Sequence, residues 1–72
     1  MIGFLAGDQL RFEYTNYREE TSVRHVIFLG LDYGENEWYP EPQWFMRVWD
    51  CEKQAYRSFA LNKIDANKIE IV

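Results

Sequence analysis

Arginine is the residue type in this sequence whose placement best indicates chemistry. Four arginines fall inside segments that alternate apolar and polar residues, and a fifth, Arg18, falls in a polar turn. The planar guanidinium group binds phosphate or carboxylate through two parallel hydrogen bonds. The alternative is pairing across strands with acidic residues on the solvent face, which contributes about 0–1 kcal/mol per pair. The four strand arginines are Arg11, Arg24, Arg47 and Arg57, and the acidic residues are Glu13, Asp50 and Glu70.

No set of residues forms a recognisable catalytic or metal-binding pattern. His25 is the only histidine, and no cysteine or second histidine lies at ligand spacing from it. The only cysteine, Cys51, lies between Asp50 and Glu52, whose negative charges disfavour the reactive thiolate. The acidic residues around Gly34 do not follow the register of a calcium loop. We therefore predict a protein that is not an enzyme, with no catalytic residues, no metal site and no cofactor.

Composition places the chain among small globular domains. Its 72 residues, 47% of them hydrophobic, are enough for one core, so we predict a single domain over residues 1–72. One cysteine allows no disulfide within the chain, which fits a reducing compartment. Neither a signal peptide nor an apolar run of about 18 residues is present, so we expect a cytoplasmic protein without membrane contact. The net charge of −4 disfavours non-specific nucleic-acid binding but is compatible with a local basic patch.

Hydrophobic periodicity predicts an all-β fold. Leu10–Thr15 alternates apolar and polar residues without a break, and Ser22–Leu31 is apolar on both faces, as in a strongly bent strand. The clearest turn is expected at 32–36, where glycine and asparagine tolerate positive φ, and a short helical or 3-10 turn at 61–66. Five short strands at this spacing indicate a meander or a small five-stranded β-barrel. The predicted strands are Leu10–Thr15, Ser22–Leu31, Gln43–Cys51, Ala55–Ala60 and Lys68–Val72.

The three tryptophans, Trp38, Trp44 and Trp49, lie within one short segment that also holds both prolines. Trp38 belongs to an aromatic and proline-rich loop over residues 38–43, where the prolines exclude a central position in a sheet. In the strand that follows, Trp44 and Met46 share one side and Trp49 lies on the other. We therefore expect one of these two tryptophans in the core and the other nearer to solvent.

Several segments together resemble the WYL domain. Trp44–Asp50 is similar to the Trp-Tyr-Leu strand that names the family and that continues to an aromatic residue followed by Asp. Ala55–Ile64 is similar to the family's Arg-x-Phe-Arg-Leu-Asp-Arg-Ile strand, and Phe12–Tyr14 with Val23–Val26 to its first hairpin. The stretch Trp38–Trp44 resembles a Trp-x-Pro-Glu-Pro-Gln-Trp segment found in short stand-alone phage and bacterial proteins.

The match departs from the family pattern at a few positions. Phe45 and Met46 replace the Tyr and Leu of the name, and Asn62 and Lys63 stand for Asp-Arg. Ala60 replaces the second arginine of the family's Arg-x-Phe-Arg strand, so this chain has one cation fewer than the family has there.

The resemblance implies an SH3-like or Sm-like barrel with a regulatory, non-catalytic role. WYL domains accompany helix-turn-helix modules in bacterial transcription regulators, where they sense a nucleotide-like or nucleic-acid ligand through a basic and aromatic patch. By position, the residues that would bind such a ligand here are Arg24, Arg57, Trp44, Tyr14 and Lys63.

A second class of function remains open from the residues alone. An exposed barrel edge and the aromatic, proline-rich loop are also typical of a phage or bacterial protein-interaction module, because Trp and Tyr are common interface anchors. The expected partners are therefore a nucleotide or single-stranded nucleic acid on one hypothesis, and a protein or a second copy of the chain on the other.

Overall fold

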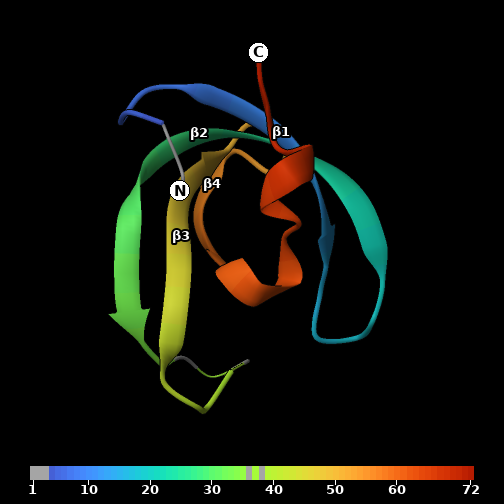
Figure 1. Cartoon of the computed structure of the whole chain (residues 1–72), viewed down its shortest axis with the longest axis vertical. Coiled ribbons are helices and arrows are strands. Elements are labelled where there is room, and N and C mark those ends of the chain that lie inside the picture. The colour runs from blue at the N-terminus through green and yellow to red at the C-terminus, as the bar shows by residue number, and fades with distance from the viewer. Residues whose placement is uncertain (1–3, 36, 38) are drawn as a thin grey trace.

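The computed structural model describes residues 4–35, 37 and 39–72, and this part of the chain folds into one antiparallel sheet. The strand order is β4-β3-β2-β1-β5, so β4 and β5 are the edges (Figure 1). Among the described residues no α-helix forms, and no helix is long and apolar enough to cross a membrane. The elements are β1 (Gln9–Thr15), β2 (Thr21–Gly34), β3 (Gln43–Asp50), β4 (Ala55–Ala60), β5 (Glu70–Ile71) and the 3-10 turns η1 (Leu61–Lys63) and η2 (Ala66–Lys68).

The all-β prediction is confirmed, and most strand positions agree with the periodicity, but two expectations on element length are wrong. β2 continues to Gly34, so the turn expected at 32–36 begins later. Two contacts with β3 stabilise this extension. Asp32 forms a diagonal ion pair with Arg47 at 3.1 Å, and the rings of the cross-strand pair Tyr33 and Trp44 meet edge to face. The closing strand is only Glu70–Ile71, because η2 occupies part of the range expected for it. Trp38 lies outside the described residues.

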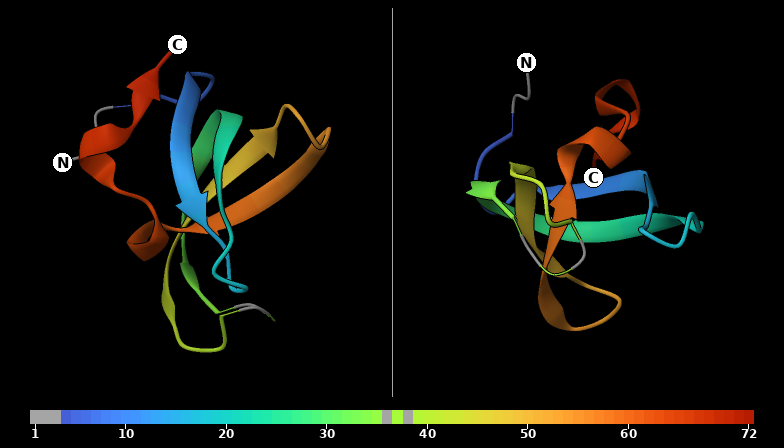
Figure 2. Two further views of the ribbon diagram at one scale, coloured as in Figure 1. Left: turned by 90° about the vertical axis from the view of Figure 1, so that its right-hand side faces the viewer. Right: turned by 90° about the horizontal axis from the view of Figure 1, so that it is seen from below.

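The sheet curls strongly, so that its edge strand β4 approaches β1. The C-terminal segment that carries η1 and η2 lies to one side of the curled sheet (Figure 2). A register shift between Phe28 and Gly30 marks an irregularity in β2, where such bulges increase bend and twist. Beyond β4, Ile64 makes an isolated bridge with Tyr14 of β1. In the part of the chain described here, the hydrogen-bonded sheet itself stays open between β4 and β1.

The core fills the inner face of this curl. Trp44 is 52% exposed and Trp49 is half-buried, so the expectation that one tryptophan lies in the core is wrong. Phe45 is buried instead, because the Tyr39 ring covers its side of β3, with ring centroids 6.0 Å apart. Trp44 lies at the start of the strand, beyond the core, and packs on Tyr33. The core residues are Leu10, Phe12, Tyr14, Val26, Phe28, Met46, Val48 and Phe59.

One carboxylate is buried with them. Asp50 at the end of β3 is 1% exposed, and its Oδ1 accepts hydrogen bonds from the backbone N–H groups of Glu52 and Lys53 at 3.0 and 3.1 Å. Its Oδ2 lies 3.8 Å from Nε of Arg57 on β4. Asp50 therefore fixes the turn between β3 and β4, and its charge lies close to an arginine whose side chain is 44% exposed.

We predict that Asp50→Ala lowers the free energy of unfolding by about 3 kcal/mol, because it removes a buried acceptor from two N–H groups and leaves Arg57 without its anion. Asp32→Ala is the matched control, since it breaks an exposed pair and is expected to cost less than about 1 kcal/mol. Urea denaturation followed by tryptophan fluorescence measures both values. Equal losses in the two variants would contradict the role assigned to Asp50.

Candidate anion-binding site

Arg24 and Arg57 converge on one aromatic ring. The guanidinium carbon of Arg24 lies 5.5 Å from the centroid of Phe59, and that of Arg57 lies 5.8 Å from the same centroid. Arg24 comes from β2 and Arg57 from β4, with β3 between them in the sheet. Both point to the inner face, because their cross-strand partners, Phe12 and Val48, are core residues. The curl of the sheet then brings β2 and β4 closer together on this face.

The two arginines line a hollow of about 90 Å³, called the arginine hollow below. It lies where β4 meets the end of the β1–β2 hairpin. Its lining contains two cations and no carboxylate, although the whole chain carries a net charge of −4. A hollow with this lining favours an anion the size of one phosphate or carboxylate group. The lining residues are Tyr14, Asn16, Tyr17, Arg24, Tyr39, Arg57, Ser58 and Phe59.

The two arginines differ in how far neighbouring groups neutralise or satisfy them. Arg57 is close to Asp50, which offsets part of its charge. Arg24 makes no ion pair with any described residue, and its Nε is shielded from solvent without a hydrogen-bond partner. A shielded donor without an acceptor is costly, so Arg24 has the larger unused capacity to bind an anion. Arg18 lies over the ring of Tyr17 at 5.4 Å but is not part of the lining.

Local hydrogen bonds hold the hairpin end that forms one wall. The side-chain oxygen of Asn16 accepts from the backbone N–H groups of Arg18 and Glu20 at 2.9 and 3.0 Å. Asparagine favours turns because its short side chain replaces a backbone acceptor in this way. The polar turn expected between the first two strands is therefore present, and it places Asn16 and Tyr17 beside the arginines.

Tyr14 supplies a buried hydroxyl group to the site and no free ring face. Its side chain is 3% exposed, and its ring packs edge to face on Phe59 with centroids 4.5 Å apart. The hydroxyl accepts from the N–H of Ala60 at 3.2 Å and lies 2.9 Å from the hydroxyl of Tyr39. Desolvation by burial, aided by the bond to Tyr39, raises the pKa of Tyr14 well above its ordinary value. Tyr14 is thus positioned at the site as expected, but not as a stacking surface.

Trp44 and Lys63, the other two residues expected at the site, lie elsewhere. Trp44 lines a different hollow, and Lys63 is exposed on η1 outside the lining of both. Sequence reasoning missed Phe59 and Tyr39. The position of Phe59, two residues after Arg57 on an alternating strand, was a usable signal. Tyr39 follows no periodic pattern, since it reaches the site from an irregular loop.

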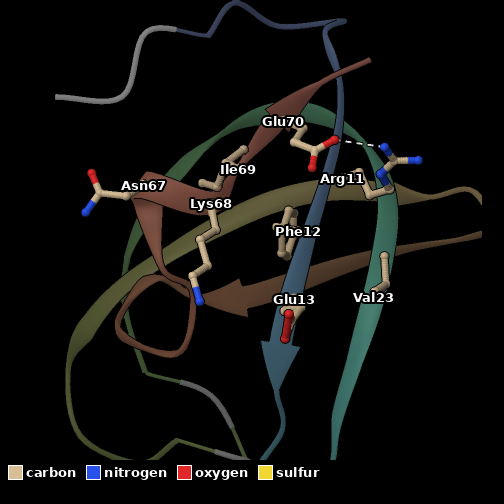
Figure 3. A pocket seen from close by; sticks show the side chains of 8 residues that line it. All are labelled: Arg11, Phe12, Glu13, Val23, Asn67, Lys68, Ile69 and Glu70. Carbon is tan, nitrogen blue, oxygen red and sulfur yellow. Dashed lines mark hydrogen bonds and ion pairs between the residues drawn. The ribbon is translucent and has the colours of Figure 1, made fainter.

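The remaining strand arginines are paired, as the alternative hypothesis expects. Arg11 bonds Glu70 at 2.8 Å, and Arg47 bonds Asp32. A hollow of about 360 Å³ lies beside the Arg11 pair (Figure 3), with Lys68 and Glu13 also on its wall. Its lining balances two cations against two anions, so it has no preference for an anion.

Two further observations concern possible metal ligands and similar proteins. Among the described residues, no group of three or more His, Cys, Asp or Glu side chains is placed to hold a metal ion. Comparison of the chain with protein-family models, with curated proteins and with solved structures finds no match. The fold and the site define an all-β protein whose curled sheet brings two inward-facing arginines together.

The free energy of unfolding of the wild-type protein should fall above about pH 10, and we predict that Tyr14→Phe removes part of this fall. Because the pKa of Tyr14 is raised on folding, the unfolded chain loses this proton first, so the hydroxyl's contribution is complete below about pH 10 and is lost as pH rises further. Tyr14→Phe should lose about 1–2 kcal/mol at neutral pH and decline less steeply above pH 10. Urea denaturation over a pH series measures this difference.

Tyr56→Phe is the control, because Tyr56 is 73% exposed and should follow the wild-type curve. Parallel curves for wild type and Tyr14→Phe above pH 10 would show that the buried hydroxyl does not titrate as proposed.

Proposed function

We propose that this protein is a non-catalytic binding module for a phosphate-bearing ligand, either a nucleotide-like molecule or single-stranded nucleic acid. The observation that carries the proposal is the convergence of Arg24 and Arg57 on Phe59 in a hollow without carboxylates. Resemblance to the WYL domain supports the same ligand class, since Arg24 and Arg57 are two of its patch positions. We place the curled five-stranded sheet, as part of this proposal, in the class of SH3-like or Sm-like small barrels.

Charge balance favours a singly charged group over a more highly charged one. Arg24 and Arg57 together contribute two positive charges, and Asp50 behind Arg57 removes about one of them. One phosphodiester group would neutralise the remainder and would give Arg24 Nε the acceptor that it lacks. The net charge of −4 opposes long-range attraction of a polyanion, so we expect binding to be local and modest in affinity.

We predict that Arg24→Gln and Arg57→Gln each weaken binding of a short oligothymidylate by at least about tenfold, because each removes a charge-assisted hydrogen bond of about 1.5–3 kcal/mol. The measurement is calorimetric titration at low salt. Neutralisation of one phosphate on a single strand also predicts that log K falls with log salt with a slope of about −0.7.

Arg47→Gln is the matched control, because it makes the same change of charge outside the arginine hollow. It should change the affinity by less than about threefold. A loss equal to that of Arg24→Gln would mean that only overall charge matters, and absence of binding to the wild-type protein would overturn the proposal. Arg57→Gln leaves the buried carboxylate of Asp50 without its cation. Thermal unfolding must therefore confirm that this variant remains folded.

A protein-interaction role is the second candidate, and the edge strand favours it. β4 is an edge of the sheet, and its outer face carries Tyr56, whose ring packs on Trp49 with centroids 4.8 Å apart. An edge strand can pair with a second copy of the chain or with another protein. Exposed aromatic residues beside such an edge are common interface anchors.

Sedimentation equilibrium separates the two candidates. If the β4 edge is the functional surface, the chain should form a concentration-dependent dimer that Tyr56→Asp abolishes and Arg24→Gln leaves intact. If the arginine hollow is the functional surface, the free chain should be monomeric, and Tyr56→Asp should retain oligothymidylate binding within about twofold.

A further inference from the structure

The hollow of about 360 Å³ occupies a gap in the edge of the sheet and is called the edge hollow below (Figure 3). β5 pairs with only two residues of β1, Leu10 and Arg11, and the chain makes one further bridge to β1 at Tyr14. Between these contacts, residues 65–69 are not paired with β1 and include η2. Because backbone pairing fixes the chain on both sides of the gap, the hollow is already formed without a ligand.

The charged side chains of the edge hollow form two groups. Arg11 and Glu70 bond each other at 2.8 Å, so each already has a partner. Glu13 and Lys68 also line the hollow, and neither side chain makes an ion pair or a hydrogen bond with a described residue. Both are exposed to water, so the lack of a partner costs little, but it leaves one anion and one cation available to a ligand.

This lining disfavours a ligand that carries a single charge. An anion bound to Lys68 would also meet the carboxylates of Glu13 and Glu70, and a cation bound to Glu13 would also meet Lys68 and Arg11. A zwitterion offers an opposite charge to each unpaired group. Its own net charge is zero, so the net charge of −4 on the chain does not repel it.

The apolar part of the lining and the size of the hollow define the rest of the ligand. Val23 is 55% exposed and Ile69 is half-buried, and both lie beside the charged groups. The volume is near the lower end of the range for small-molecule sites, which is about 300–1,000 Å³. The edge hollow therefore has room for a small zwitterion with one apolar branch.

We propose that the edge hollow binds a free α-amino acid with an apolar side chain. The carboxylate of the ligand contacts Lys68, its ammonium group contacts Glu13, and its side chain packs on Val23 and Ile69. Exposed ion pairs contribute little each, so we expect a dissociation constant on the order of 1 mM. The proposal does not depend on the arginine hollow, since this ligand carries no phosphate.

L-leucine and two analogues that each lack one charge test the proposal. Isocaproate lacks the ammonium group, and isoamylamine lacks the carboxylate. In ¹⁵N–¹H spectra at low salt, leucine should shift the backbone amide signals of Glu13 and Lys68. Each analogue should bind about fivefold more weakly, which corresponds to the loss of one ion pair. D-leucine should also bind more weakly, because it cannot make all three contacts at once.

Variants assign the two charges. Glu13→Gln should abolish the preference for leucine over isocaproate, and Lys68→Met should abolish the preference for leucine over isoamylamine. Glu52→Gln and Lys63→Met are the matched controls, because they make the same changes of charge outside the edge hollow and should keep both preferences. Thermal unfolding confirms that the variants remain folded.

Three outcomes would overturn the proposal. The first is the absence of a leucine-dependent shift in the wild-type protein. The second is equal affinity for leucine and N-acetyl-leucinamide, which carries neither charge. The third is loss of leucine binding in Arg24→Gln, which would place the carboxylate in the arginine hollow instead.

Discussion

The contact between Tyr14 and the end of β4 is the interaction on which the rest of this structure depends. β1 and β4 are separated by two strands in the sheet order, and only the curl brings them together. Tyr14 then packs on Phe59, and its hydroxyl accepts from the N–H of Ala60 on the edge strand. A buried hydroxyl needs such a partner, and an edge N–H needs an acceptor, so one hydrogen bond satisfies both groups. This contact joins β1 to β4 next to the place where Arg24 and Arg57 converge on Phe59.

The distribution of charge follows from the same curl. Arg11 and Arg47 remain in exposed ion pairs, whereas Arg24 and Arg57 lie on the side that the curl closes. The two hypotheses for the strand arginines are therefore not exclusive. Arg57 is part of the arginine hollow and is also held in place by the buried Asp50.

The alternation of residues was sufficient to predict β1, β3 and β4 to within one residue at each end, because each has one face on the core. It also predicts that Arg57 and Phe59 share a face. It does not predict how close Arg24 and Arg57 lie, since that distance depends on the irregularity in β2 and the amount of curl. Nor does it place Trp44, because the alternation continues past the point where the core ends. The loop that carries Tyr39 follows no period, and the contact between the hydroxyl groups of Tyr39 and Tyr14 is a tertiary one that alternation cannot predict.

The junction between β4 and η1 is common to the arginine hollow and the hollow that Trp44 lines. Phe59 lines the arginine hollow and Leu61 lines the hollow beside Trp44, so the two hollows meet across two residues, roughly 7 Å of extended chain. Ala60 between them is fully buried, and its N–H is bonded to Tyr14. A displacement of Ala60 would shift the backbone of both neighbours and therefore change both linings together. The hydroxyl of Tyr14 therefore stabilises the edge strand and, through one backbone position, the geometry of both hollows.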